Sequence, residues 1–237
     1  MLCPSEARIP HWKPYLPLAI FPLLALFPFN WVEFSLGFHH RRDPMPTNLA
    51  QKAEKLNLYV LWFRHGLVLA LVLGTAAFQS LPFSQIGLRL DGWQPNALIG
   101  VGAGALHFGL QRLFWRLRPL SNTNDKRLAA EPRAKWILSQ LFSVLAEELW
   151  LAFCVVSLIR AGHSASVAVL LPATVFGALH YQYRVGAIGT GVYGAISASL
   201  FLWRGSLIPP YLFHFIGNIG ALYWARRGAA LLRREGV

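Results

Sequence analysis

Long apolar runs separated by short polar or basic segments dominate the sequence. A membrane-spanning helix needs about 20 predominantly apolar residues. Runs of this length predict helices near residues 15–38, 56–78, 95–115, 136–160, 164–183, 186–203 and 206–225. Prolines interrupt the first run, so an eighth span or a re-entrant first segment is the alternative there. The pattern predicts an all-α, polytopic membrane bundle of seven or eight transmembrane helices.

Composition supports the membrane class and excludes two others. Of the 237 residues, 55% are hydrophobic and 14% are charged, whereas soluble domains carry about 25% charged residues. Intrinsic disorder needs low hydrophobicity and high charge, so it is excluded. A disulfide scaffold is excluded because Cys3 and Cys154 are the two cysteines. The sequence shows no internal repeat, and we expect one integral-membrane domain over residues 1–237.

The formal charge of +12 arises from 22 Lys and Arg against 10 Asp and Glu. In a soluble protein this surplus would favour a nucleic-acid partner. In a membrane bundle, basic residues gather in the cytoplasmic loops, and the richest segment here is 112–135. The surplus therefore predicts membrane lipid rather than nucleic acid as the surroundings, with the C-terminus in the cytoplasm.

Two of the ten acids, Glu147 and Glu148, lie in the middle of the apolar run 136–160. A charged side chain at the bilayer centre costs at least about 2.5 kcal/mol, so such residues are candidates for function. A structural polar pair facing the bundle interior is the alternative. Adjacent helical residues point about 100° apart. We therefore expect one carboxylate to face water and the other to pack or hydrogen-bond beside it.

Two later apolar runs carry polar residues at helical spacing. Phe176 and His180 share one helix face, as do His214 and Asn218. His180 could be an ordinary interhelical hydrogen-bonding residue. Together with the two glutamates, however, these residues supply a base for activating water and donors for a developing oxyanion. The set predicts hydrolysis within the membrane, with a glutamate–histidine pair sharing a water and with His214 and Asn218 as donors.

The order Glu-Glu, Phe-x-x-x-His, His-x-x-x-Asn resembles the CPBP family, over about residues 136–225. These are the type II CAAX prenyl endopeptidases and their bacterial relatives, glutamic-type intramembrane proteases. The resemblance implies a helical bundle in the bacterial inner membrane, with its catalytic cavity inside the membrane. It assigns the water-activating base to Glu147 and a supporting role to Glu148. It further implies that His180 holds the water, and that His214 and Asn218 form the oxyanion site.

One position departs from the family pattern. The first motif is usually Glu-Glu-x-x-x-Arg, but Ala152 stands where the arginine is expected. Glu148 must then find another cation, stay protonated or matter less. Arg64 is a candidate replacement because it also lies in an apolar run, although it could instead extend to the nearest membrane interface. The role of its neighbour His65 stays open.

The function expected from these residues is an intramembrane endopeptidase. It would cleave a peptide bond near the membrane, in a lipidated tail or a C-terminal sorting signal of a membrane-associated protein or peptide. One alternative is a catalytically impaired member that acts in bacteriocin immunity or as a scaffold. No cofactor is expected; a zinc protease using the same Glu and His residues is the minority alternative, since no HExxH motif occurs. A proton-relay transporter lacks the support of an inverted repeat.

Two further features favour structural interpretations. Cys154 is expected to be a small buried hydrophobic residue. The glycines of the sixth run are expected to allow close helix packing; they are Gly186, Gly189, Gly191 and Gly194.

Overall fold

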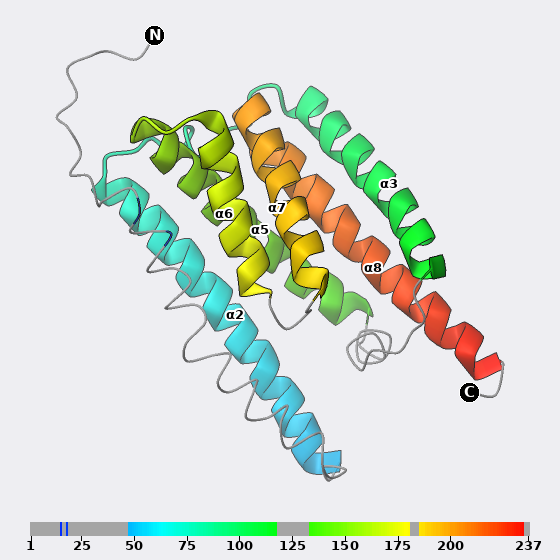
Figure 1. Cartoon of the computed structure of the whole chain (residues 1–237). Coiled ribbons are helices and arrows are strands. Elements are labelled where there is room, and N and C mark those ends of the chain that lie inside the picture. The colour runs from blue at the N-terminus through cyan, green and yellow to red at the C-terminus, as the bar shows by residue number, and fades with distance from the viewer. Residues whose placement is uncertain (1–14, 16–17, 19–46, 118–132, 181–184, 235–237) are drawn as a thin grey trace.

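The computed structural model describes residues 15, 18, 47–117, 133–180 and 185–234. This part of the chain folds into six helices and contains no strand (Figure 1). They are α2 (Thr47–Phe78), α3 (Trp93–Leu117), α5 (Arg133–Arg160), α6 (Ala165–Leu179), α7 (Val185–Arg204) and α8 (Ile208–Arg234). The all-α prediction is confirmed for these residues, and six predicted runs each fall on one helix. The predicted helix at 15–38 lies outside the described residues, apart from Tyr15 and Leu18.

Membrane-spanning character is clearest in two helices. Within the described residues, Trp136–Arg160 of α5 and Gly186–Arg204 of α7 are long and apolar enough to cross a bilayer, by length and composition. Shorter apolar helices cover Trp62–Phe78 and Ala165–Leu179. The structure is thus that of a helical, membrane-type protein, while the number of seven or eight spans stays a prediction.

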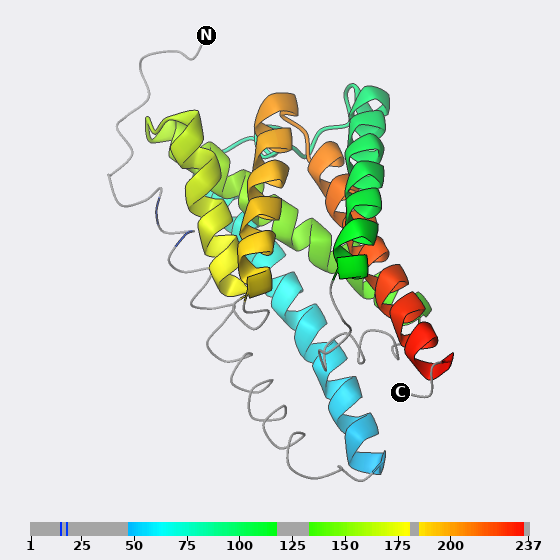
Figure 2. The same ribbon diagram turned by 45° about the vertical axis from the view of Figure 1, so that its right-hand side comes forward.

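Helix α5 lies at the centre of the bundle. It packs against α2, α6, α7 and α8, and Figure 1 shows it behind α6 and α7. Turning the molecule shows that α6 and α7 stand side by side, as do α3 and α8 (Figure 2). The middle of α5 is almost completely buried, from Leu149 to Val155, and includes Ala152 and Cys154. The expectation that Cys154 is a small buried residue is confirmed.

The close contact between α6 and α7 depends on small residues. A Cβ atom on Gly177 would lie 2.8 Å from the carbonyl oxygen of Ala187 and 3.0 Å from the Cα of Gly191. A Cβ on Gly194 would lie 3.0 Å from the ring of Phe176. The packing role predicted for these glycines is confirmed at Gly191 and Gly194. It is wrong at Gly189, where a Cβ would meet no described atom within 4 Å.

The turn between α7 and α8 fixes where α8 begins. Gly205 has a φ of +61°, and its N–H donates to the carbonyl of Phe201 at 2.7 Å, which ends α7. Pro209 and Pro210 occupy the first turn of α8, where the backbone N–H groups have no partner within the helix. The N–H of Leu207 donates to the carbonyl of Gly87 at 3.1 Å and ties this turn to the loop before α3.

Candidate active site

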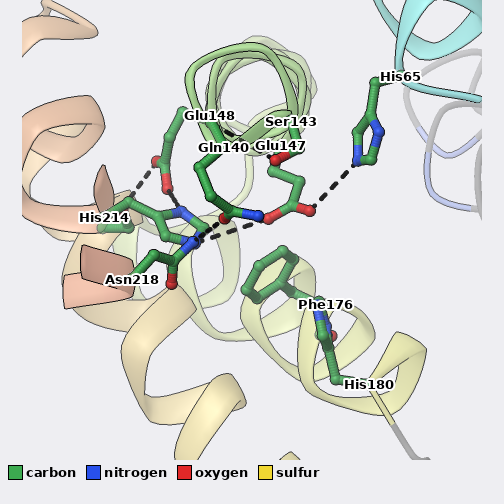
Figure 3. A network of polar contacts seen from close by, with 10 residues as sticks. His65, Gln140, Ser143, Glu147, Glu148, Phe176, His180, His214 and Asn218 are labelled. Carbon is green, nitrogen blue, oxygen red and sulfur yellow. Dashed lines mark hydrogen bonds and ion pairs between the residues drawn. The ribbon is translucent and has the colours of Figure 1, made fainter. Parts of the chain in front are cut away.

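The two adjacent glutamates of α5 occupy different surroundings. The side chain of Glu148 is 2% exposed, whereas that of Glu147 is 23% exposed. Their directions differ because successive residues of a helix are rotated by about 100°. Glu148 points toward α7 and α8, and Glu147 lies between α2 and α8 (Figure 3). The expectation of one buried and one more accessible carboxylate is confirmed.

Both oxygens of the Glu148 carboxylate have close partners. Oε1 lies 2.6 Å from Nδ1 of His214, and Oε2 accepts a hydrogen bond of 2.7 Å from the hydroxyl of Ser197. All three side chains are buried. Hydrogen bonds with an ionised partner are shorter and roughly twice as strong as neutral ones. Glu148 is therefore held in place by α7 and α8 together.

These contacts answer the question raised by the missing arginine. Glu148 is partnered by His214 and Ser197, so the hypothesis that Arg64 replaces the arginine is wrong for this structure. Ala152, one turn after Glu148, has no exposed surface and belongs to the central apolar cluster. The apolar core is packed around Ala152, the position where the family pattern places an arginine.

Two imidazoles flank the carboxylate of Glu147. Its Oε1 lies 3.6 Å from Nε2 of His65, on α2, and its Oε2 lies 3.7 Å from Nε2 of His214, on α8 (Figure 3). Both distances exceed the 2.7–3.2 Å of a formed hydrogen bond. Catalytic contacts are often long without substrate and tighten in the reacting complex. His214 thus faces both glutamates, one with each ring nitrogen.

His180 stands at the C-terminal end of α6. Its Nδ1 lies 2.8 Å from the carbonyl oxygen of Phe176, and a carbonyl can only accept, so Nδ1 carries the hydrogen. In a neutral ring Nε2 is then an acceptor. The ring centroids of Phe176 and His180 are 4.6 Å apart, and Phe176 also meets His214 edge-on at 6.1 Å. Phe176 therefore links the two imidazoles that the sequence motifs predicted.

Asn218 lies one turn after His214 on the same face of α8. Its Nδ2 donates a hydrogen bond of 2.7 Å to Oε1 of Gln140, which lies two turns before Glu147 on α5. Tyr193 of α7 packs edge-on against His214, with ring centroids 4.8 Å apart. These contacts fix the orientation of both side chains on α8.

The structure brings the five predicted site residues to one region of the bundle. Glu147, Glu148 and His214 make direct contacts, His180 adjoins through Phe176, and Asn218 is held by the neighbouring Gln140. Their catalytic roles remain predictions.

Three site residues were not predicted from the sequence, namely His65, Gln140 and Ser197. Gln140 carried a signal, because a residue seven positions before Glu147 lies on the same helix face. His65 carried a weaker one, as an ionisable residue in an apolar run. Ser197 carried none.

Metal binding by this set of residues gains no support from the geometry. In the part of the chain that the structure describes, no three or more His, Cys, Asp or Glu side chains are grouped so as to hold a metal ion.

Comparison with known proteins identifies the segment that carries the site. Residues 129–220 match the family model of type II CAAX prenyl endopeptidase Rce1-like proteins, and they include α5 to α7 and the first half of α8. Neither the curated proteins nor the solved structures give a significant match to the chain. Residues 129–220 are thus similar to the Rce1-like family of type II CAAX prenyl endopeptidases, which are membrane-embedded peptide hydrolases.

Proposed function

We propose that this protein is a glutamic-type intramembrane endopeptidase in which Glu147 activates the attacking water. The observation that carries the proposal is the difference between the two carboxylates. Glu147 is partly exposed and flanked by His65 and His214, whereas Glu148 is buried and fully partnered behind it. A general base must reach both water and substrate, and of the two glutamates Glu147 has that access.

Hydrolysis at this site requires two proton transfers. The water oxygen attacks the scissile carbonyl carbon while its proton passes to Glu147, with His180 Nε2 holding the water. The carbonyl becomes an oxyanion. When the oxyanion collapses, the C–N bond breaks and Glu147 returns the proton to the leaving nitrogen. The second water proton stays on the new carboxyl group, so the products are a carboxylic acid and an amine, which exchange this proton to become a carboxylate and an ammonium ion.

The proposed oxyanion donors are His214 and Asn218. In the proposed state Glu148 is ionised and accepts from Nδ1 of His214, and Nε2 also donates because the ring is an imidazolium whose charge Glu148 balances. Asn218 uses one hydrogen of its amide for Gln140 and keeps a second for the oxyanion. Preorganised donors of this kind act where negative charge develops.

The proposed substrate is a peptide bond close to the membrane, in a lipidated tail or a C-terminal sorting signal. The family match and the apolar helices α5 and α7 support a membrane-associated protein or peptide as partner. We further propose the bacterial inner membrane as its location, with the C-terminus in the cytoplasm, because basic residues gather in alternate loops.

A second candidate function rests on Ala152, which replaces the arginine of the family pattern. An inactive member acting in immunity or as a scaffold would explain that loss. Against it stands the Ser197–Glu148–His214 network, which keeps Glu148 partnered without the arginine. An inactive protein has no need for two carboxylates in an apolar helix.

The test uses the full-length protein in lipid vesicles and two fluorogenic probe peptides. One carries a farnesylated C-terminal CAAX box, and the other carries an unprenylated C-terminal sorting signal with its apolar helix. We expect the wild type to cleave one probe, and Glu147→Gln to cleave neither while remaining folded. Cleavage of neither probe by the wild type, or unchanged cleavage by Glu147→Gln, would refute the proposal. Loss of activity with a chelator, restored by zinc, would favour the zinc alternative.

A further inference from the structure

His65 lies in the candidate site but outside the segment that matches the family. It is on α2, within the described range Thr47–Phe78, whereas the match covers 129–220. Its side chain is 4% exposed, and its Nε2 lies 3.6 Å from Oε1 of Glu147. Figure 3 shows the ring directed toward Glu147 from the side opposite His214. The N-terminal part of the chain therefore contributes a group to the site.

The position of His65 is set by an aromatic contact between α2 and α5. Trp62, one turn before His65, stacks on Phe142 with ring centroids 5.8 Å apart and planes 26° from parallel. Phe142 lies five residues before Glu147 on α5. A Cβ on Gly66 would also come within 3.9 Å of the Phe142 ring. The stacked pair holds the two helices in register beside the Glu147 carboxylate.

The carboxylate of Glu147 must be held in one orientation if it is to act as a base. The terminal torsion of a glutamate is broad, so an unrestrained carboxylate samples many orientations. A donor on one oxygen fixes the direction of the other. Nε2 of His65 lies 3.6 Å from Oε1 and can donate to it when the contact tightens in the reacting complex, which would direct Oε2 to the His214 side of the site.

We infer that His65 is a positioning residue for the general base, holding Oε1 of Glu147 so that Oε2 is presented to the attacking water. This inference rests on the proposed function. His65 acts through Glu147 and does not touch the substrate. Its loss should therefore lower kcat and leave KM unchanged. A misplacement of about 1 Å at a reacting group can cost about 10²-fold in rate.

The experiment compares three substitutions of His65 in the full-length protein in vesicles, with whichever of the two probe peptides the wild type cleaves. His65→Ala removes the donor. His65→Gln places an amide N–H near the position of Nε2, and His65→Asn keeps an amide that reaches only to the position of Nδ1. His163→Ala, at a histidine outside the site in the turn before α6, is the control.

We expect His65→Ala and His65→Asn to lower kcat about 10²-fold with KM unchanged, and His65→Gln to recover most of the lost rate. The His163→Ala control should match the wild type. Because Gln and Asn are both polar amides, a comparison of these two separates positioning from a folding defect even if His65→Ala unfolds.

Three results would overturn the inference, namely wild-type kcat in His65→Ala or His65→Asn, a rise in KM alone, or a His65→Gln variant as slow as His65→Asn. The last would assign His65 a proton-carrying or purely structural role. Failure of the proposed function is distinguishable, because Glu147→Gln would then retain activity. Loss of activity in Glu147→Gln together with full activity in His65→Asn refutes the positioning role alone.

Discussion

Adjacent positions on α5 give Glu147 and Glu148 different chemistry. Glu148 is immobilised by two short contacts, and Glu147 is approached by two imidazoles at longer distances. The different directions of the two side chains follow from helix geometry and were predicted from the sequence. The partners were predicted only in part, because contacts between helices depend on their relative rotation and height. His214 was expected near the glutamates, whereas Ser197 and His65 were not.

The hydroxyl of Ser197 is the donor that stabilises Oε2 of Glu148. We expect Ser197→Ala to lower the free energy of unfolding by about 0.5–2 kcal/mol, the range found for interhelical hydrogen bonds in membranes. Thermal unfolding in detergent measures the effect. Ser199→Ala is the control, since Ser199 lies on the same helix, is exposed and bonds only to the Ala195 carbonyl among the described residues. Equal stability of the two variants would contradict the role of Ser197.

Asn218 is expected to act on rate rather than on substrate binding. Removing one oxyanion donor costs about 10²–10³-fold in kcat in other enzymes. We predict a loss of this order for Asn218→Ala, measured with the probe peptide that the wild type cleaves. Gln140→Ala should lose less, because it frees the amide of Asn218 but leaves its donor in place. A kcat for Asn218→Ala equal to that of the wild type would exclude it from the oxyanion site.

Helix boundaries show what an apolar pattern can predict. The runs at 95–115, 136–160 and 186–203 fall within α3, α5 and α7, with ends that differ by a few residues. The pattern placed the start of one helix at 56 and the end of another at 225, whereas α2 begins at Thr47 and α8 ends at Arg234. Both extensions are polar or basic. A helix can continue through polar and basic residues, but the extent of an apolar run does not show where such a helix ends.

The contact between α6 and α7 positions Phe176, and through it His180. Gly177→Ala would bring a Cβ within 2.8 Å of the Ala187 carbonyl oxygen, so the two helices must separate. We expect a loss of about 1–3 kcal/mol in unfolding free energy, as for overpacked cores, together with reduced cleavage. A Cβ on Gly189 of α7 would meet no described atom within 4 Å, so the control Gly189→Ala should be neutral or slightly stabilising. Equal stability in both variants would show that the contact is looser than the structure indicates.

The bundle as a whole places a residue of α2 beside residues of α5 and α8, more than 80 positions later in the chain. No local pattern in the sequence predicts which helices are neighbours. The family resemblance covered the later helices and therefore did not include α2. The lengths of the apolar runs predicted the all-α class and each of the six described helices, and the motifs selected five residues that lie in the candidate site, but the arrangement of the helices required the structure.

Orientation in the membrane is a prediction for the whole molecule. The basic residues of the tail, Arg226, Arg227, Arg233 and Arg234, indicate a cytoplasmic C-terminus. A green fluorescent protein fused to Val237 should fluoresce in bacterial cells, and an alkaline phosphatase fused there should be inactive. The opposite pair of results would reverse the proposed orientation.

The central claim is that Glu147 is the general base and Glu148 its buried support. The most direct measurement is kcat of Glu147→Gln against the wild type in vesicles, with Asp91→Asn as control at an exposed carboxylate of the loop before α3. Glu147→Gln keeps the size and polarity of the glutamate side chain but cannot accept the proton of the attacking water. We predict no detectable cleavage by folded Glu147→Gln and wild-type cleavage by Asp91→Asn. Wild-type kcat in Glu147→Gln would contradict the account.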